Sequence, residues 1–262
     1  MDILVCVKHV PETAEAEIKI SPNGKTIEKS GLVFDINEWD DYALEEAVRI
    51  KEKLGGTVTV ITVGSEDSDS TLRKCLARGA DKAIRVTDPK LEGSDSYAIA
   101  KTLHKVVKTL PFNIILTGAL ADDDGYTSTG PMLAELLEIP HATMIKKVEL
   151  SGDTAKVNRE LEGGLEEVVD VKLPAVLTIQ TGINEPRYVS IMGIRKAMQK
   201  EIKAFSLAEI GLNESEAGEL GSWIRIDKMY VPPAEKQANF LKGTPDEVAA
   251  KIAEILKAKG LV

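Results

Sequence analysis

The chain has 262 residues, which suits one large domain or one domain with an extension. A hydrophobic share of 43% and a charged share of 29% are typical of a soluble globular protein. The net charge of −9 argues against a dedicated nucleic-acid binder, because contacts to phosphates require a basic surface. No apolar run approaches the length that spans a membrane, and the first residues begin a strand pattern rather than a signal peptide.

The first half of the chain alternates apolar runs with helical patterns. Four apolar runs predict buried strands, at residues 3–7, 58–63, 82–86 and 114–118. Helical periodicity predicts helices at residues 40–54, 68–77 and 94–109, and another that begins near Pro131. A hairpin is expected within residues 17–27. This alternation predicts an α/β fold, a doubly wound parallel sheet with helices on both faces.

The pattern changes after Pro140. Strand-like segments separated by turn residues predict an added antiparallel meander, at residues 144–150, 155–161, 166–171 and 175–180. Residues 206–217 carry a short helical pattern, and residues 223–233 are extended and limited by prolines. A polar linker follows, and a capping box from Thr244 to Glu247 begins a C-terminal helix that could pack on its own domain or on another chain.

The strand at residues 114–118 leads into a loop of small, polar and acidic residues, and then into a helix. A strand, a small-residue loop and a helix start present backbone N–H groups to an anion. Thr127, Ser128 and Thr129 add three hydroxyl groups where a phosphate would lie. An ordinary loop with a helix cap explains the same residues equally well. The run of Asp122, Asp123 and Asp124 would repel a phosphate, so part of it must turn away.

The sequence contains no common catalytic set. Glycine-rich dinucleotide and P-loop motifs are missing, and no nucleophile elbow is present. His9, His104 and His141 are far apart and lack metal-ligand spacing. Cys6 and Cys75 lack motif spacing too, so we expect free thiols in a cytoplasmic protein. A nucleotide-shaped fold without a general base or nucleophile favours a binding or carrier protein over an enzyme.

In a parallel α/β sheet, ligands bind outside the carboxyl ends of the strands, where the strand order reverses. Those ends lie here near residues 6–8, 63–65 and 117–119, and residues 37–40 belong to the same rim. Trp39 within that rim is either a core anchor or a contact for a ring-shaped ligand or partner.

The run Val157-Asn-Arg-Glu-Leu-Glu-Gly-Gly-Leu-Glu-Glu-Val-Val-Asp-Val-Lys-Leu-Pro-Ala-Val-Leu-Thr178 resembles the signature of the electron transfer flavoprotein β-subunit. Asn184-Glu-Pro-Arg-Tyr188 follows where that family has it, and residues 3–9, 37–47 and 72–86 are similar to family segments too. The resemblance covers nearly the whole chain and is strongest to flavoproteins of methylotrophic bacteria. It implies an adenine nucleotide α-hydrolase-like fold and a heterodimer with an α-subunit that binds most of one FAD.

The resemblance also implies that this subunit binds a structural AMP. The residues carried over for cofactor binding are Cys6, Asn37, Glu38, Trp39, Asp40, Ser65, Gly118, Ala119, Leu120, Ala121, Asp122, Asp123, Asp124, Gly125, Tyr126, Thr127, Ser128 and Thr129. Thr127, Ser128 and Thr129 would hold the phosphate, and Trp39 would lie near the dimethylbenzene edge of the flavin. Thr13 matches a second position near that edge but is not aromatic.

Residues 182–203 resemble the recognition loop that docks on partner dehydrogenases, and Ile191 stands where the family has a leucine anchor. From the residues alone, a buried Ile191 at a strand end is the alternative. The implied partners are flavoprotein dehydrogenases, of acyl-CoA or amine type, and a quinone reductase or similar acceptor. We expect residues 1–233 to form the AMP-binding domain and residues 234–262 to form an arm that packs on the α-subunit.

Two alternative functions stay open. Electron-bifurcating relatives bind a second FAD in place of AMP, and Pro131 is similar to theirs, although their loop commonly reads Asp-Gly-Asp-Thr. The bare α/β pattern also allows a stand-alone adenine-nucleotide sensor, which would need neither the meander nor the C-terminal arm. The role of Asp122, Asp123 and Asp124 has no explanation from the sequence.

Overall fold

The computed structural model describes residues 1–13, 16–233 and 238–262. In the described residues, the main feature is a nine-stranded mixed sheet. Its strands are, in spatial order, β11 (Ile202–Phe205), β5 (Lys82–Val86), β4 (Thr57–Val63), β1 (Asp2–Cys6), β6 (Ile114–Gly118), β10 (Ala175–Ile179), β7 (His141–Ser151), β8 (Thr154–Glu160) and β9 (Glu166–Lys172). The strands from β11 to β7 are parallel, and β8 and β9 continue the sheet antiparallel.

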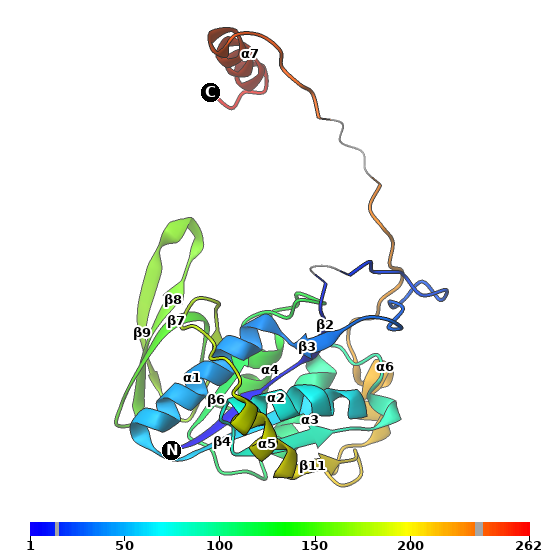
Figure 1. The fold of residues 1–262 in the computed structure, drawn as a ribbon, viewed down its shortest axis with the longest axis vertical. Coiled ribbons are helices and arrows are strands. Elements are labelled where there is room, and N and C mark those ends of the chain that lie inside the picture. Colours follow the sequence, from blue (N-terminus) through cyan, green and yellow to red (C-terminus); the bar gives the residue numbers. More distant parts are fainter. Residues whose placement is uncertain (14–15, 234–237) are drawn as a thin grey trace.

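Helices cover both faces of the parallel part (Figure 1). On one face lie α1 (Glu38–Leu54), α2 (Asp69–Arg78) and α5 (Ile191–Gln199); on the other lie α3 (Ser96–Val107) and α4 (Thr129–Leu137). Alternate side chains of β1 enter the two layers, because successive strand residues point to opposite faces. Ile3 and Val5 pack under α1, and Leu4 and Cys6 pack under α3 and α4. The predicted doubly wound α/β fold is therefore confirmed.

The prediction for β10 was wrong. Its apolar run was assigned to the antiparallel meander, but β10 lies between β6 and β7 and pairs in parallel with both. All five of its residues are buried, as is typical of a strand covered on both faces. The strands β8 and β9 alternate between buried and exposed residues over part of their length, and they form a hairpin that extends beyond the layered body in Figure 1.

Two further segments differ from the prediction. The expected helix at residues 206–217 is a series of turns with one 3₁₀ turn at Glu214–Glu216 and a positive φ at Gly211. The expected hairpin within residues 17–27 is reduced to one bridge between Ile20 and Ile27. In its place, β2 (His9–Pro11) pairs with β3 (Phe34–Ile36) in a small separate sheet.

The C-terminal part of the chain follows the short helix α6 (Gly218–Gly221). The predicted capping box of Thr244 and Glu247 is present and begins α7 (Pro245–Ala258). In Figure 1, α7 lies apart from the sheet and its covering helices, and none of its residues is buried. Ile252 and Ile255 on this helix are both exposed. Among the described residues, no helix is long and apolar enough to cross a membrane.

Candidate functional site

A cavity opens at the carboxyl ends of β1, β4 and β6 and has a volume of about 180 Å³. From β1 the chain moves to β4 on one side, and it later returns to β6 on the other, so this is the point where the strand order reverses. The floor is apolar, with Cys6, Ile61 and Leu103 buried at the bottom. This is the place where the strand pattern predicts a ligand.

Two helices begin at the cavity wall. Asp95 caps α3 by accepting a hydrogen bond from Ala98 N at 2.9 Å, and Ser94, Asp95 and Ser96 line the cavity. Ser128, Thr129 and Gly130 also line it, at the start of α4. The unpaired N–H groups at a helix start favour an anion, and the hydroxyls of Thr127, Ser128 and Thr129 lie beside them. The wall can therefore hold a phosphate.

Gly130 makes the start of α4 fit closely against the sheet. A Cβ atom there would come within 2.5 Å of Thr178 Cγ2 and 2.9 Å of Thr117 Oγ1. Close packing is therefore the reason for a glycine at this position. Backbone conformation is not the reason, since the φ of Gly130 lies outside the left-handed region. The contact holds the helix start at the ends of β6 and β10.

Asp40 joins the ends of two central strands. Its carboxylate accepts hydrogen bonds from Lys8 N at 2.7 Å and from Gly118 N at 2.8 Å. Burial raises the pKa of Asp40 to about 7, although the two backbone N–H groups oppose that change. Nearby, burial and the charge of Asp40 raise the pKa of Cys6 to about 12, so this thiol stays protonated and is not an activated nucleophile.

The acidic loop folds over the rim of the cavity through two sets of contacts. Asp122 turns toward the start of α1: its N–H donates to Asn37 Oδ1 at 3.0 Å, and its carboxylate accepts from Glu38 N at 3.2 Å. Asp123 and Asp124 accept from Lys8 Nζ at 2.5 and 2.7 Å. The loop is thus fixed to β1 and to α1, which accounts for the acidic run structurally.

Most residues assigned to cofactor binding from the resemblance lie together in this cavity. Those that line it are Cys6, Asn37, Asp40, Gly118, Ala119, Leu120, Ala121, Asp124, Tyr126, Thr127, Ser128 and Thr129. Those that do not line it are Glu38, Trp39, Ser65, Asp122, Asp123 and Gly125. Ser65 borders a separate cavity with His9 and Phe34. Trp39 is half-buried and donates from Nε1 to Gln180 Oε1 at 2.8 Å.

Some lining residues were missed from the sequence. Lys8 lies two residues after β1, within the strand end predicted at residues 6–8, but it was not among the residues assigned to cofactor binding. Ser94, Asp95 and Ser96 carry the cap signature of α3, which points to the cavity only once the fold is known. In the described part of the chain, no group of three or more metal-ligating side chains is placed to hold a metal ion.

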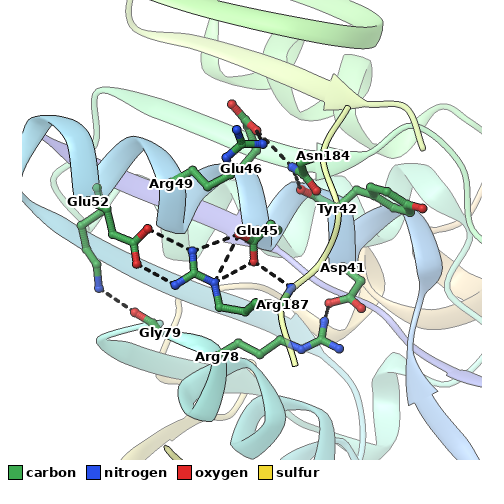
Figure 2. A network of polar contacts seen from close by, with 11 residues as sticks. Asp41, Tyr42, Glu45, Glu46, Arg49, Glu52, Arg78, Gly79, Asn184 and Arg187 are labelled. Atoms are coloured by element: carbon green, nitrogen blue, oxygen red, sulfur yellow. Dashed lines mark hydrogen bonds and ion pairs between the residues drawn. The ribbon is translucent and has the colours of Figure 1, made fainter. Parts of the chain in front are cut away.

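A second site of interest is the segment that leads into α5, because charged groups hold it on α1 (Figure 2). The guanidinium of Arg187 donates to Glu45 from Nε and Nη2, both at 2.9 Å, and to Glu52 from Nη1 at 2.6 Å. Asn184 donates to Tyr42 O at 3.1 Å and to Glu46 at 3.0 Å. These contacts fix residues 184–187 against α1.

This anchoring presents a row of apolar side chains on α5. Ile191, the first residue of the helix, is 75% exposed, and Met192, Ile194 and Met198 are also exposed. Ser190 caps the helix by accepting from Gly193 N at 3.0 Å. The alternative of a buried Ile191 at a strand end is therefore wrong. An exposed apolar patch on a fixed helix suits a binding surface for another protein.

A family model described as the electron transfer flavoprotein domain matches residues 25–210. The chain is 42% identical over 260 residues to the electron transfer flavoprotein subunit beta of Methylophilus methylotrophus, covering 98% of each chain. It is 38% identical to that of Thermoanaerobacterium thermosaccharolyticum and 36% identical to that of Bacillus subtilis, covering 100% of each chain in both cases. These relatives are named as electron-transfer subunits, which are carriers rather than enzymes. The cavity at the strand-order reversal and these full-length matches together place the chain in the electron transfer flavoprotein family, among its β-subunits.

Proposed function

We propose that this chain works as the β-subunit of a heterodimeric electron transfer flavoprotein that holds a structural AMP. The cavity between α3 and α4 is the observation that carries the proposal, because it combines an apolar floor with an anion-binding wall. An adenosine ring system suits the floor of Cys6, Ile61 and Leu103, and a phosphate suits the hydroxyls and N–H groups at the start of α4. AMP would supply no redox chemistry there; it would fill the cavity and tie the strand ends together.

The flavin would lie outside this cavity, mostly in the α-subunit. Trp39 is the residue of this chain that we assign to the flavin edge. It stands at the start of α1, half-buried, with its ring held by the hydrogen bond to Gln180. A ring fixed in this way can pack against a planar cofactor with little loss of side-chain freedom. Thr13 is exposed and offers no aromatic contact.

The exposed face of α5 would dock on the dehydrogenases that supply electrons, with Ile191 as its anchor. Replacing Ile191 with alanine should lower the rate of electron transfer from the dehydrogenase about tenfold, since an interface anchor contributes about 1–2 kcal/mol. The AMP and FAD contents should stay unchanged. Leu220→Ala is a matched control, because Leu220 is exposed to a similar degree but lies on α6. Equal electron-transfer rates for Ile191→Ala and Leu220→Ala would contradict the assignment of α5 as the docking surface.

The arm of residues 234–262 would pack on the α-subunit. Within its described part, α7 exposes Ile252 and Ile255, and none of the residues of this helix is buried. Co-production of this chain with an FAD-binding α-subunit should yield a complex that releases one AMP and one FAD on denaturation. A stable monomer free of AMP would contradict the proposal and favour another class of protein. Two FAD molecules per complex would favour the bifurcating alternative. Pro131, in the first turn of α4, is the residue of this chain that is similar to bifurcating relatives. The electron donors and acceptors that we propose are flavoprotein dehydrogenases and a quinone reductase.

A further inference from the structure

The helix α5, assigned above to docking, is short and contributes little to the core. It has nine residues, and only Ala197 among them is buried. An isolated helix of fewer than about 12–15 residues is marginal in water, so α5 depends on the contacts that hold it to the rest of the fold. Its main neighbour is α2, beside which it lies (Figure 1).

The backbones of α5 and α2 approach each other closely at Gly193. A Cβ atom on Gly193 would lie 2.6 Å from Ala77 O, a carbonyl oxygen near the end of α2. A backbone carbonyl cannot turn away as a flexible side chain can, so a larger residue at this position would push the two helices apart. Glycine therefore allows α5 to lie directly on α2.

Arg73, in the middle of α2, holds the other end of α5. Its guanidinium donates hydrogen bonds to Ala197 O at 2.6 Å and to Lys200 O. Carbonyl groups at the end of a helix lack a partner within the helix, and a cation at this end also interacts favourably with the helix dipole. Lys200 adds a contact in the reverse direction, because its Nζ donates to Ala80 O at 2.6 Å, two residues after α2.

α2 is itself well fixed in the fold. Leu72, Cys75 and Leu76 are buried in the core, and Lys74 forms an ion pair with Asp35 of β3. Close packing of this kind resists displacement of the helix. No residue of α2 lines the cavity at the strand-order reversal, so nucleotide binding gives this helix no direct role.

We propose that Arg73 and Gly193 are positioning residues for electron transfer: they mount α5 on α2 and hold Ile191 where a dehydrogenase contacts it. This inference rests on the proposed function, in which α5 is the docking surface. Both residues act through α5 and not by contact with the dehydrogenase. Without the mount, α5 has to become ordered each time a dehydrogenase binds, and the entropic cost of that ordering weakens binding.

The first measurement follows hydrogen exchange in the full-length chain, purified as a complex with an FAD-binding α-subunit. Arg73→Ala removes the donor at the end of α5, and Gly193→Ala places a Cβ atom against Ala77 O. In both variants the amides of residues 193–200 should exchange about tenfold faster than in wild type, because fewer contacts keep this helix closed. The FAD content should stay at the wild-type level.

The second measurement is the rate of FAD reduction at increasing concentrations of the complex, counted by its bound FAD. The probe is an acyl-CoA dehydrogenase with saturating acyl-CoA substrate or, where that enzyme does not reduce the wild-type complex, an amine dehydrogenase with its amine. The KM for the complex should rise about tenfold in Arg73→Ala and in Gly193→Ala. The kcat should change less than about twofold, because the mount affects docking and not the flavin.

Lys74→Ala is the matched control for Arg73→Ala. It removes a cation from the next position of the same helix, but Lys74 pairs with Asp35 and not with α5. Its KM and the hydrogen exchange of α5 should equal those of wild type. Arg73→Lys keeps the charge but lacks the planar guanidinium, so its KM should lie between those of wild type and Arg73→Ala.

Several results would overturn the proposal. A KM within about twofold of wild type in both mount variants, unchanged exchange of α5, or a lower kcat at unchanged KM would each contradict it. An equal rise in KM for Lys74→Ala would show that the charge of α2, and not the mount, matters. Because the two mount variants alter different helices, one decides the matter if the other does not fold.

The variant Ile191→Ala separates this inference from the proposed function. If Ile191→Ala leaves the KM unchanged, the docking role of α5 is wrong and the positioning role of Arg73 and Gly193 is wrong with it. If Ile191→Ala raises the KM and neither mount variant does, the positioning role alone is wrong.

Discussion

Replacing Arg187 with alanine should destabilise the fold by about 2–3 kcal/mol. The side chain of Glu45 is only 7% exposed and loses two N–H donors, while that of Arg187 is 33% exposed. Removing one partner of a fully buried pair costs about 3–5 kcal/mol, and the exposure of the guanidinium lowers that figure. Glu52 is 55% exposed and adds less than about 1 kcal/mol.

Urea unfolding of the full-length chain, followed by circular dichroism, measures this change from the shift in midpoint at constant slope. Arg49→Ala is the matched control: Arg49 is 53% exposed and lies 3.8 Å from Glu46, which is too far for a hydrogen bond, so its loss should cost less than about 0.5 kcal/mol. A double-mutant cycle of Arg187→Ala with Glu45→Ala should give a coupling energy of about 1–3 kcal/mol. A loss no larger than that of the control, or a coupling energy near zero, would refute the reasoning.

Two other perturbations test the cavity. Asp40→Asn should make the free energy of unfolding depend less on pH between about 4 and 7. The pKa of Asp40 in the folded protein is about 7, above its ordinary value of 3.8. The contribution of this carboxyl group to stability is therefore present below about pH 4 and is lost as pH rises through about 7. Unfolding curves of both proteins at several pH values measure this, and equal slopes against pH would contradict it. Gly130→Ala should destabilise the protein by about 1–3 kcal/mol and lower the retained AMP, because its Cβ would overlap Thr178. Urea unfolding and the AMP content of the purified protein measure these two effects. An unchanged free energy of unfolding and an unchanged AMP content would show that α4 can shift to make room for the Cβ without loss of stability.

The central strands could be predicted from the sequence because each is a continuous apolar run covered by helices on both sides. For β10 the same signal was present, but periodicity does not say which strands will be its neighbours. α5 was missed because only Ala197 on it is buried, so it has no apolar stripe facing a core. Ser190 is a cap residue that the sequence does display, but the helix is held to the fold by long-range contacts that it does not, such as the bond from Arg73 to Ala197 O.

The residues of the candidate site also fall into those that the sequence could nominate and those that it could not. The residues of the loop at 118–129 could be nominated because they follow a strand and precede a helix. Lys8 could not be paired with Asp123 and Asp124, since it lies more than a hundred residues from them in the chain. Trp39 and Ser65 were assigned through the resemblance and lie outside the cavity lining. Local signals thus find the parts of a site, and the long-range contacts that close it become visible only in the fold.

The position of β10 has a consequence for how the protein is made. β6 and β7 are synthesised well before β10, which later fills the gap between them. At roughly 5–20 residues per second, the ribosome needs about 3–11 s to proceed from the end of β6 to the start of β10. During that interval the edge of β6 that β10 will cover has no partner strand, and an unpaired apolar edge is a template for aggregation. The parallel part of the sheet therefore stays in two pieces, on either side of the place of β10, until residues 175–179 have been made.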